Sequence, residues 1–163
     1  MKTASALARR LVSVLTQQGM TVSIAESCTG GLIAKLITDI PGSSAVFPGA
    51  CVTYTNSVKE QLLGVNPAVI ARDTEVSEAC AREMADGIRS RLGTSVGIST
   101  TGYAGPGGGT PANPVGTVYI AVSTERGTVC ERFSAPVSST RTQVRMSAAR
   151  RAIAMALQTV ENE

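Results

Sequence analysis

Hydrophobic and polar positions alternate with helical and strand periods along the chain. Met1–Gln18 has apolar residues three and four positions apart, which predicts a helix that ends near Gly19. The apolar, β-branched run Thr21–Ala25 predicts a buried strand, and Leu32–Ile40 returns to the helical period until Pro41 ends it. The chain thus begins with a helix, a strand, a tight turn and a second helix.

The same alternation continues toward the C-terminal end. The further elements predicted are a strand over Ala45–Thr55 interrupted at Pro48-Gly49, a helix from Asn56 to Gly64, a helix capped by Ser77, a strand over Ser95–Thr101, a hairpin of Val115–Ser123 with Thr128–Ser134, and a last helix opened by a capping box of Thr140 and Gln143. This order predicts one α/β domain over residues 1–163, a three-layer α/β/α sandwich with a mixed, mostly parallel sheet. Ligands of such sheets bind beyond the carboxyl ends of the strands, where the turns after Ala25, Thr55 and Thr101 should meet.

Composition argues against several functional classes. The chain of 163 residues is 43% hydrophobic and 17% charged, which is typical of one globular domain. A net charge of +3 and an aromatic share of 3% give nucleic-acid binding little support. No stretch reaches the ~20 apolar residues that span a bilayer, and no signal peptide is present, so we expect a cytoplasmic protein without a membrane partner. Four cysteines without a C-x-x-C pair and no histidine argue against a protein-bound metal.

Ser27 lies where the first predicted strand passes into a helix. Its hydroxyl would face unpaired backbone N–H groups at the positive end of the helix dipole, a place that suits an attacking oxygen and its oxyanion. The same place suits a residue that only caps the helix, as Ser27 or Thr29 could. Gly30 and Gly31 weaken the capping account, because glycine in a first turn costs ~1 kcal/mol relative to alanine. Close approach of a ligand would explain both glycines.

A serine nucleophile needs a base, and without histidine the candidates are lysine, a carboxylate or tyrosine. Lys2 lies at the terminus and Lys35 lies mid-helix, whereas Lys59 falls in the first turn of a helix that follows a strand end. Partial burial and the helix dipole would both favour the neutral form of Lys59, although a surface lysine is the ordinary alternative. Tyr54 could relay a proton or simply pack, and Glu26 could polarise the site or bind backbone N–H groups.

The glycine-rich segment Gly102–Gly109 matches neither the P-loop nor the dinucleotide-binding fingerprint. The nucleophile elbow G-x-S-x-G of α/β-hydrolases is also absent, because Glu26 and Cys28 flank Ser27. The glycine-rich segment could wrap closely around a substrate, or it could be a mobile surface loop.

Four strings occur in order along the chain. They are AESCTGG at Ala25–Gly31, GACVTYTN at Gly49–Asn56 with Lys59 after it, TGYAGPGG at Thr101–Gly108 and PVGTV at Pro114–Val118. Together they resemble the CinA C-terminal domain family, over roughly residues 5–160. Characterised members of that family are nicotinamide mononucleotide deamidases.

The resemblance implies a metal-independent amidohydrolase that converts nicotinamide mononucleotide and water to nicotinic acid mononucleotide and ammonia, within pyridine-nucleotide salvage and without a cofactor. It implies that Ser27 attacks the carboxamide carbon, that Lys59 takes up the serine proton and later delivers it to ammonia, and that Tyr54 orients the transfer. Backbone N–H groups near Cys28–Gly30, or at Gly102, would stabilise the oxyanion. The residues expected to bind the nucleotide are Thr29, Gly30, Gly31, Thr101, Gly102, Gly105, Gly107, Arg141 and Arg145, the two arginines as phosphate ligands.

Some features leave alternatives open. Pro136–Thr140 precedes Arg141, where family members often have a glycine and a polar residue, so this loop could differ in shape, and the late arginines could also solvate a helix face. Many relatives have an additional N-terminal domain, and the chain resembles the stand-alone form; we expect a homo-oligomer. The competing functions are a non-catalytic module that binds a nucleotide or a partner protein, and an amidase for another small amide.

Overall fold

A computed structural model describes residues 3–162, and Met1, Lys2 and Glu163 lie outside the described residues. The elements in chain order are α1 (Ala4–Gln18), β1 (Val22–Glu26), α2 (Leu32–Thr38), a 3-10 turn η1 (Ser43–Ala45), β2 (Gly49–Val52), α3 (Asn56–Leu63), α4 (Pro67–Asp73), α5 (Glu78–Leu92), β3 (Val96–Gly102), β4 (Thr117–Thr124), β5 (Gly127–Ser134) and α6 (Arg141–Glu161). The predicted alternation of strands and helices is therefore present, with a hairpin near the C-terminal end.

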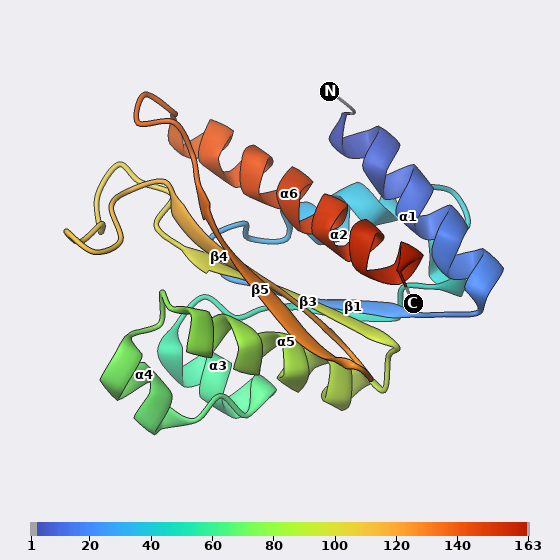
Figure 1. The fold of residues 1–163 in the computed structure, drawn as a ribbon, viewed down its shortest axis with the longest axis horizontal. Coiled ribbons are helices and arrows are strands. Elements are labelled where there is room, and N and C mark those ends of the chain that lie inside the picture. The colour runs from blue at the N-terminus through green and yellow to red at the C-terminus, as the bar shows by residue number, and fades with distance from the viewer. Residues whose placement is uncertain (1–2, 163) are drawn as a thin grey trace.

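The strands form one mixed five-stranded sheet in the order β2-β1-β3-β4-β5. β2, β1 and β3 are parallel, β4 is antiparallel to β3, and β5 is antiparallel to β4, so that only β4 runs against the other strands. Helices α1, α2 and α6 cover one face of the sheet, and α3, α4 and α5 cover the other (Figure 1). This arrangement confirms the three-layer α/β/α sandwich with a mixed sheet.

Both faces of the sheet pack against helices, and β1 shows how its residues divide between them. Ile24 belongs to the core formed with α1, α2 and α6, whereas the next residue, Ala25, packs with α3, α4 and α5, as the alternation of side chains along a strand requires. All five residues of β1 are buried, which fits a central strand covered on both sides. Within residues 3–162, no helix combines the length and the apolar character that a membrane span requires.

Local capping signals fix several helix ends. α1 ends at Gly19, whose φ of +65° is a left-handed conformation that glycine adopts without strain. The Ser77 side chain accepts a hydrogen bond from the Cys80 N–H at the start of α5. At the start of α6, the side chains of Thr140 and Gln143 each accept from the other residue's backbone N–H, which is the predicted capping box.

The segment that contains β2 differs from its prediction. The strand expected over Ala45–Thr55 pairs with β1 only over Gly49–Val52, because Ser43–Ala45 forms a 3-10 turn and Pro48 has no N–H to donate. α3 begins one residue earlier than an N-cap at Asn56 predicts, because Thr55 is the N-cap and Asn56 is the first helical residue.

Helix α4 lies where no element was predicted. Asn66 accepts a hydrogen bond from the Ala68 N–H, and Pro67 occupies the first helical position, where its missing N–H does no harm. The helix is only seven residues long, and Val69 is its one buried residue. A single buried position produces no helical period in the sequence, so the element was missed.

The carboxyl ends of the three parallel strands lie at one edge of the sheet. Glu26 at the end of β1 pairs with Val52 of β2 on one side and with Thr100 of β3 on the other. The loop between β3 and β4 and the start of α6 lie at the same end of the molecule, at the left of Figure 1. The prediction that the turns after Ala25, Thr55 and Thr101 converge is therefore confirmed.

Candidate functional site

The hydroxyl and the amine that the sequence singled out meet at this edge. Ser27 follows β1 directly and Lys59 lies in α3, and the distance between Ser27 Oγ and Lys59 Nζ is 3.2 Å. Lys59 Nζ also donates to the carbonyl oxygen of Thr53, at 2.9 Å. This second contact holds the amine in place, so the pair is kept together although the two residues are 32 positions apart in the chain.

Lys59 is fully buried, with 0% of its surface exposed. Burial lowers the pKa of its amine below the ordinary value of 10.5, because the charged form loses its hydration. The carboxylate of Glu75 and the thiols of Cys80 and Cys28 act in the opposite direction and only partly offset this effect. The amine is therefore shifted toward the neutral form, which can accept a proton from the Ser27 hydroxyl.

Cys28 lies beside Ser27 but is not poised as a nucleophile. Its thiol is buried, and the loss of hydration raises its pKa to about 12. All four cysteines are free. Among residues 3–162 there is no group of three or more histidine, cysteine, aspartate or glutamate side chains placed to hold a metal ion.

A small cavity opens onto the Ser27 hydroxyl and has a volume of about 200 Å³. It is lined by Ser27, Cys28, Tyr54, Glu75, Val76, Thr101, Gly102, Tyr103, Ala104, Gly105, Gly107 and Arg141. Ser27, Tyr54, Thr101, Gly102, Gly105, Gly107 and Arg141 are among the residues predicted from the sequence, and Lys59 reaches the cavity through its contact with Ser27. Thr29, Gly30, Gly31 and Arg145 do not line it.

Glu26 caps helix α2 rather than facing the cavity. Its carboxylate is fully buried and accepts hydrogen bonds from the backbone N–H groups of Gly31 and Ile33, at 3.1 Å each, and of Ala34, at 2.9 Å. These N–H groups at the helix start have no intrahelical partner, and the negative charge also matches the helix dipole. Of the two roles considered for Glu26, backbone hydrogen bonding is the one present.

Backbone conformation explains the two glycines of this turn. Gly30 and Gly31 have φ values of +59° and +91°, which residues with a Cβ rarely adopt. Arg145 closes the turn from outside, because its Nε donates to the Cys28 carbonyl at 3.1 Å and its Nη2 to the Thr29 carbonyl at 2.9 Å. The two glycines and the hydrogen bonds from Arg145 thus account for the shape of this turn.

Thr29 and Thr101 also stabilise this edge through their hydroxyl groups. Thr29 Oγ1 lies 2.7 Å from Thr100 Oγ1, and both residues are fully buried. Thr101 donates to the main-chain carbonyl of Glu75, at 2.6 Å, which fastens the link between α4 and α5 to the end of β3. Of these threonines, only Thr101 lines the cavity.

Tyr54 and Arg141 form the outer wall of the cavity. Arg141 donates from Nη2 to the Tyr54 hydroxyl at 3.0 Å and from Nη1 to the Gly105 carbonyl at 2.6 Å. Tyr54 is 58% exposed, and within the described part of the chain its hydroxyl has Arg141 as its only hydrogen-bond partner. The structure therefore places Tyr54 at the mouth of the cavity without a hydrogen bond to Ser27 or Lys59.

The glycine-rich loop after β3 is fastened by hydrogen bonds at both ends. Tyr103 N–H donates to the Thr117 carbonyl at 2.9 Å, and Gly116 N–H donates to the Tyr103 carbonyl at 2.7 Å. A Cβ on Gly102 would come 2.4 Å from the Thr117 carbonyl oxygen, so that glycine is required by the neighbouring strand. A Cβ on Gly107 would meet nothing within 4 Å.

Five cavity residues were not named as catalytic or substrate-binding residues from the sequence: Cys28, which was considered only for its backbone N–H group, and Glu75, Val76, Tyr103 and Ala104. Tyr103 and Ala104 lie inside the glycine-rich string and were accessible to that analysis. Glu75 and Val76 lie in the link between α4 and α5, far from every other site segment in sequence. Hydrogen bonds from Thr101 to the Glu75 carbonyl and from Asn113 to the Val76 carbonyl hold this link at the cavity.

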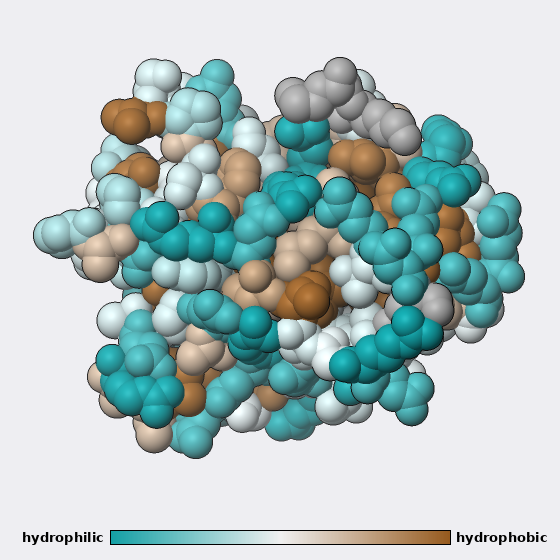
Figure 2. All heavy atoms as spheres, in the orientation of Figure 1, coloured by the Kyte–Doolittle hydropathy of each residue, from teal (hydrophilic) through white to brown (hydrophobic). Residues whose placement is uncertain are grey.

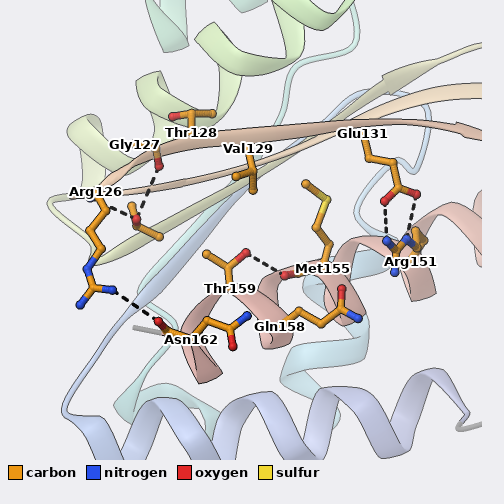
Figure 3. A pocket seen from close by; sticks show the side chains of 11 residues that line it. Arg126, Gly127, Thr128, Val129, Glu131, Arg151, Met155, Gln158, Thr159 and Asn162 are labelled. Carbon is orange, nitrogen blue, oxygen red and sulfur yellow. Dashed lines mark hydrogen bonds and ion pairs between the residues drawn. The ribbon is translucent and has the colours of Figure 1, made fainter.

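A larger hollow lies elsewhere, between β5 and the C-terminal half of α6, and has a volume of about 600 Å³ (Figure 3). Met155 and Val129 face each other across this groove, and Glu131 and Arg151 form an ion pair at one end. Figure 2 shows a small hydrophobic area near the centre of this face, within a largely hydrophilic surface. The hydroxyl groups that line the groove come from threonines, and no lysine lines it, so the groove has no counterpart of the Ser27–Lys59 pair.

Comparison with known sequences identifies relatives over most of the chain. A family model described as the CinA C-terminal domain matches residues 4–160. A CinA-like protein of Myxococcus xanthus is 50% identical over 151 residues, which are 92% of this chain and 35% of that protein. A CinA-like protein of Synechocystis is 51% identical over 115 residues, which are 71% of this chain and 28% of that protein. The chain thus spans about a third of the length of these curated relatives.

Solved structures agree with the sequence comparison. The competence/damage inducible protein CihA from Agrobacterium tumefaciens is 38% identical, with a TM-score of 0.93 over 99% of this chain and 97% of that chain. A CinA superfamily protein from Klebsiella pneumoniae is 30% identical, with a TM-score of 0.94 over 99% of this chain and 100% of that chain. In sequence and in fold, this chain belongs to the CinA C-terminal domain family.

Proposed function

We propose that the protein hydrolyses the carboxamide of nicotinamide mononucleotide to the carboxylate, with release of ammonia. The single observation on which this depends is the distance of 3.2 Å between Lys59 Nζ and the Oγ of Ser27, a residue that lines the cavity. A hydroxyl with a base in hydrogen-bond reach is the arrangement of an activated nucleophile. The choice of substrate rests on the resemblance to the CinA C-terminal domain family, whose characterised members are deamidases of this nucleotide.

The proposed reaction proceeds through an ester on Ser27. The neutral amine of Lys59 takes the hydroxyl proton while Ser27 Oγ attacks the carboxamide carbon. The resulting ammonium gives its proton to the leaving nitrogen as the C–N bond breaks and ammonia departs. Water then attacks the ester with Lys59 as the base again, which frees the Ser27 hydroxyl and the carboxylic acid. The Thr53 carbonyl, which accepts from Lys59 Nζ, keeps the amine in place for both steps.

The turn after β1 offers donors for the oxyanion. The Gly30 N–H donates to the Ser27 carbonyl, and the Gly31 N–H donates to Glu26. The N–H groups of Cys28 and Thr29 have no oxygen acceptor within residues 3–162. We assign these two N–H groups to the oxyanion that forms when Ser27 attacks, because preorganised donors at that position stabilise developing negative charge.

Arg141 is the proposed partner of the substrate phosphate. It lines the cavity, and its two contacts, to Gly105 and Tyr54, are with neutral groups, so its positive charge is not paired with a carboxylate. Tyr54 is assigned to hold this guanidinium at the mouth. Arg145 is assigned to the turn after β1, because its hydrogen bonds go to the Cys28 and Thr29 carbonyls.

The experiment that tests the proposal measures ammonia and ligand binding in parallel. Wild type is expected to release ammonia from nicotinamide mononucleotide and to act far more slowly on free nicotinamide, which has no phosphate for Arg141. Ser27→Ala is expected to bind the nucleotide without turnover, and Ser138→Ala, which alters an exposed serine, serves as the matched control with full activity. Binding by wild type without turnover would favour a non-catalytic module, and equal rates on both amides would favour an amidase for another small amide.

A further inference from the structure

Glu75 is the one carboxylate that lines the cavity of Ser27. It lies in the link between α4 and α5, and its main-chain carbonyl accepts the hydrogen bond from Thr101 Oγ1 at 2.6 Å. The preceding residue, Thr74, is the only non-glycine residue with a positive φ (+68°) within residues 3–162. The backbone thus adopts an unusual conformation directly before the residue that it presents to the cavity.

The carboxylate of Glu75 has no hydrogen bond and no ion pair with any other described side chain. Its charge nevertheless acts on the site. It contributes, after burial, to the raised pKa of the Tyr103 hydroxyl, and it partly opposes the lowering of the pKa of the Lys59 amine. The carboxylate is therefore within electrostatic range of the reacting groups, half-buried and unpaired.

Glu75 and Arg141 give the cavity two charges of opposite sign. Both line it, and no ion pair joins them or links either one to another described side chain. Charged groups that are partly removed from water are costly unless a partner compensates them. A ligand with a positive charge near its amide and a negative charge at its other end would compensate both.

We propose that Glu75 is a specificity-determining residue, which selects a substrate with a cationic ring next to the carboxamide. This inference rests on the proposed function, because nicotinamide mononucleotide has a pyridinium ring of this kind. The carboxylate attracts the ring charge across a half-buried cavity, where a charge pair interacts more strongly than in bulk water. Glu75 is not the base, because Lys59 already lies within hydrogen-bond distance of Ser27 and no hydrogen bond joins Glu75 to it.

The test compares two ligands that differ in ring charge. Nicotinamide mononucleotide has a cationic ring, and its dihydro form has the same amide, ribose and phosphate on a neutral ring. Binding of each is measured by calorimetry to Ser27→Ala and to Ser27→Ala with Glu75→Gln, which keeps the shape of the side chain and removes its charge. Ser27→Ala with Glu125→Gln, which alters an exposed carboxylate in the β4–β5 turn, is the control.

The expected result is selective for charge. Glu75→Gln should weaken binding of the cationic form about five- to tenfold and leave the neutral form within about twofold, as loss of one partly solvated charge pair predicts. Equal weakening of both forms would show a merely structural role and overturn the inference, as would no weakening of the cationic form or no binding of either form. If wild type releases no ammonia but the charge-selective pattern holds, the proposed hydrolysis fails while the assignment of Glu75 as a cation-selecting residue stands.

Discussion

The cavity at the carboxyl edge of the sheet measures about 200 Å³, whereas the groove between β5 and α6 measures about 600 Å³. The groove is larger, but two of its charged side chains, Glu131 and Arg151, form an ion pair, and a third, Arg126, donates to the Asn162 carbonyl. Met155 and Val129 make much of the remaining lining apolar. The cavity has a nucleophile with its base, and two charged side chains, Glu75 and Arg141, that form no ion pair within residues 3–162. The comparison shows that the site is identified by a nucleophile next to its base and by charged side chains without an ion pair, and not by the volume of the hollow.

The most stringent test of which hollow is the active site removes one hydroxyl group from each of them. Ser27→Ala is expected to lower kcat on nicotinamide mononucleotide by about 10³-fold or more, because it removes the hydroxyl that Lys59 contacts. Thr159→Ala removes a hydroxyl that lines the groove and should leave kcat within about twofold. Ammonia release under saturating substrate measures both. A large loss of kcat in Thr159→Ala would indicate that the reaction takes place in the groove.

The arginines of the two hollows provide the next contrast. Arg141→Ala should raise KM for the nucleotide about tenfold with a smaller change in kcat, because a charge-assisted contact to phosphate is lost. Arg151→Ala breaks the ion pair with Glu131 and should leave KM unchanged. It should lower the free energy of unfolding by less than about 1 kcal/mol, as a partly exposed pair predicts. Steady-state kinetics measure KM for both variants. If Arg141→Ala has the same KM as wild type, Arg141 is not a phosphate ligand.

Two glycines of the cavity are expected to differ in stability. Gly102→Ala places a Cβ 2.4 Å from the Thr117 carbonyl oxygen, and the required shift should lower the free energy of unfolding by about 2 kcal/mol. Gly107→Ala meets no atom within 4 Å and should change stability by less than about 0.5 kcal/mol. Urea unfolding of both variants measures the difference. Equal stabilities would show that β4 does not constrain Gly102.

The smallest expected effect concerns the stability cost of burying Lys59. Burial lowers its pKa in the folded state below 10.5, so the unfolded chain binds more protons between the folded pKa and 10.5. In that window the free energy of unfolding of wild type rises with pH. Lys59→Met removes this titration, should be more stable than wild type by about 1 kcal/mol at neutral pH, and should lose that advantage as the pH approaches 10.5. Lys35→Met, which alters an exposed lysine, is the control. If the free energy of unfolding depends on pH in the same way in wild type and in Lys59→Met, burial of the Lys59 charge does not cost stability.

Local signals were sufficient for much of the fold. Gly19, Ser77 and the Thr140–Gln143 pair each act within a few residues of the chain, so their caps could be predicted. Helix α4 could not be predicted, because it is short and has only one buried position. Its packing against α5 stabilises a helix that has no hydrophobic period in its sequence. The length of β2 could not be predicted from the sequence either, because pairing with β1 decides where the strand begins.

The site divides in a similar way. Ser27 and Lys59 were predictable because each follows a strand end, and parallel strands bring such ends together. Glu75 was not, because its place depends on a hydrogen bond from Thr101 across 26 positions. Arg145 was predicted as a phosphate ligand from its spacing with Arg141, but helical spacing does not reveal that the backbone turn after β1 lies beneath it.

The most direct measurement of the central claim is kcat/KM of Lys59→Arg on nicotinamide mononucleotide, with Lys35→Arg as the matched control. A guanidinium stays protonated at any working pH and cannot take the proton of Ser27. We predict a loss of about 10³-fold in Lys59→Arg and a value within about twofold of wild type in Lys35→Arg, whose side chain is exposed and paired with Asp39. If Lys59→Arg keeps more than about a tenth of the wild-type value, Lys59 is not the base.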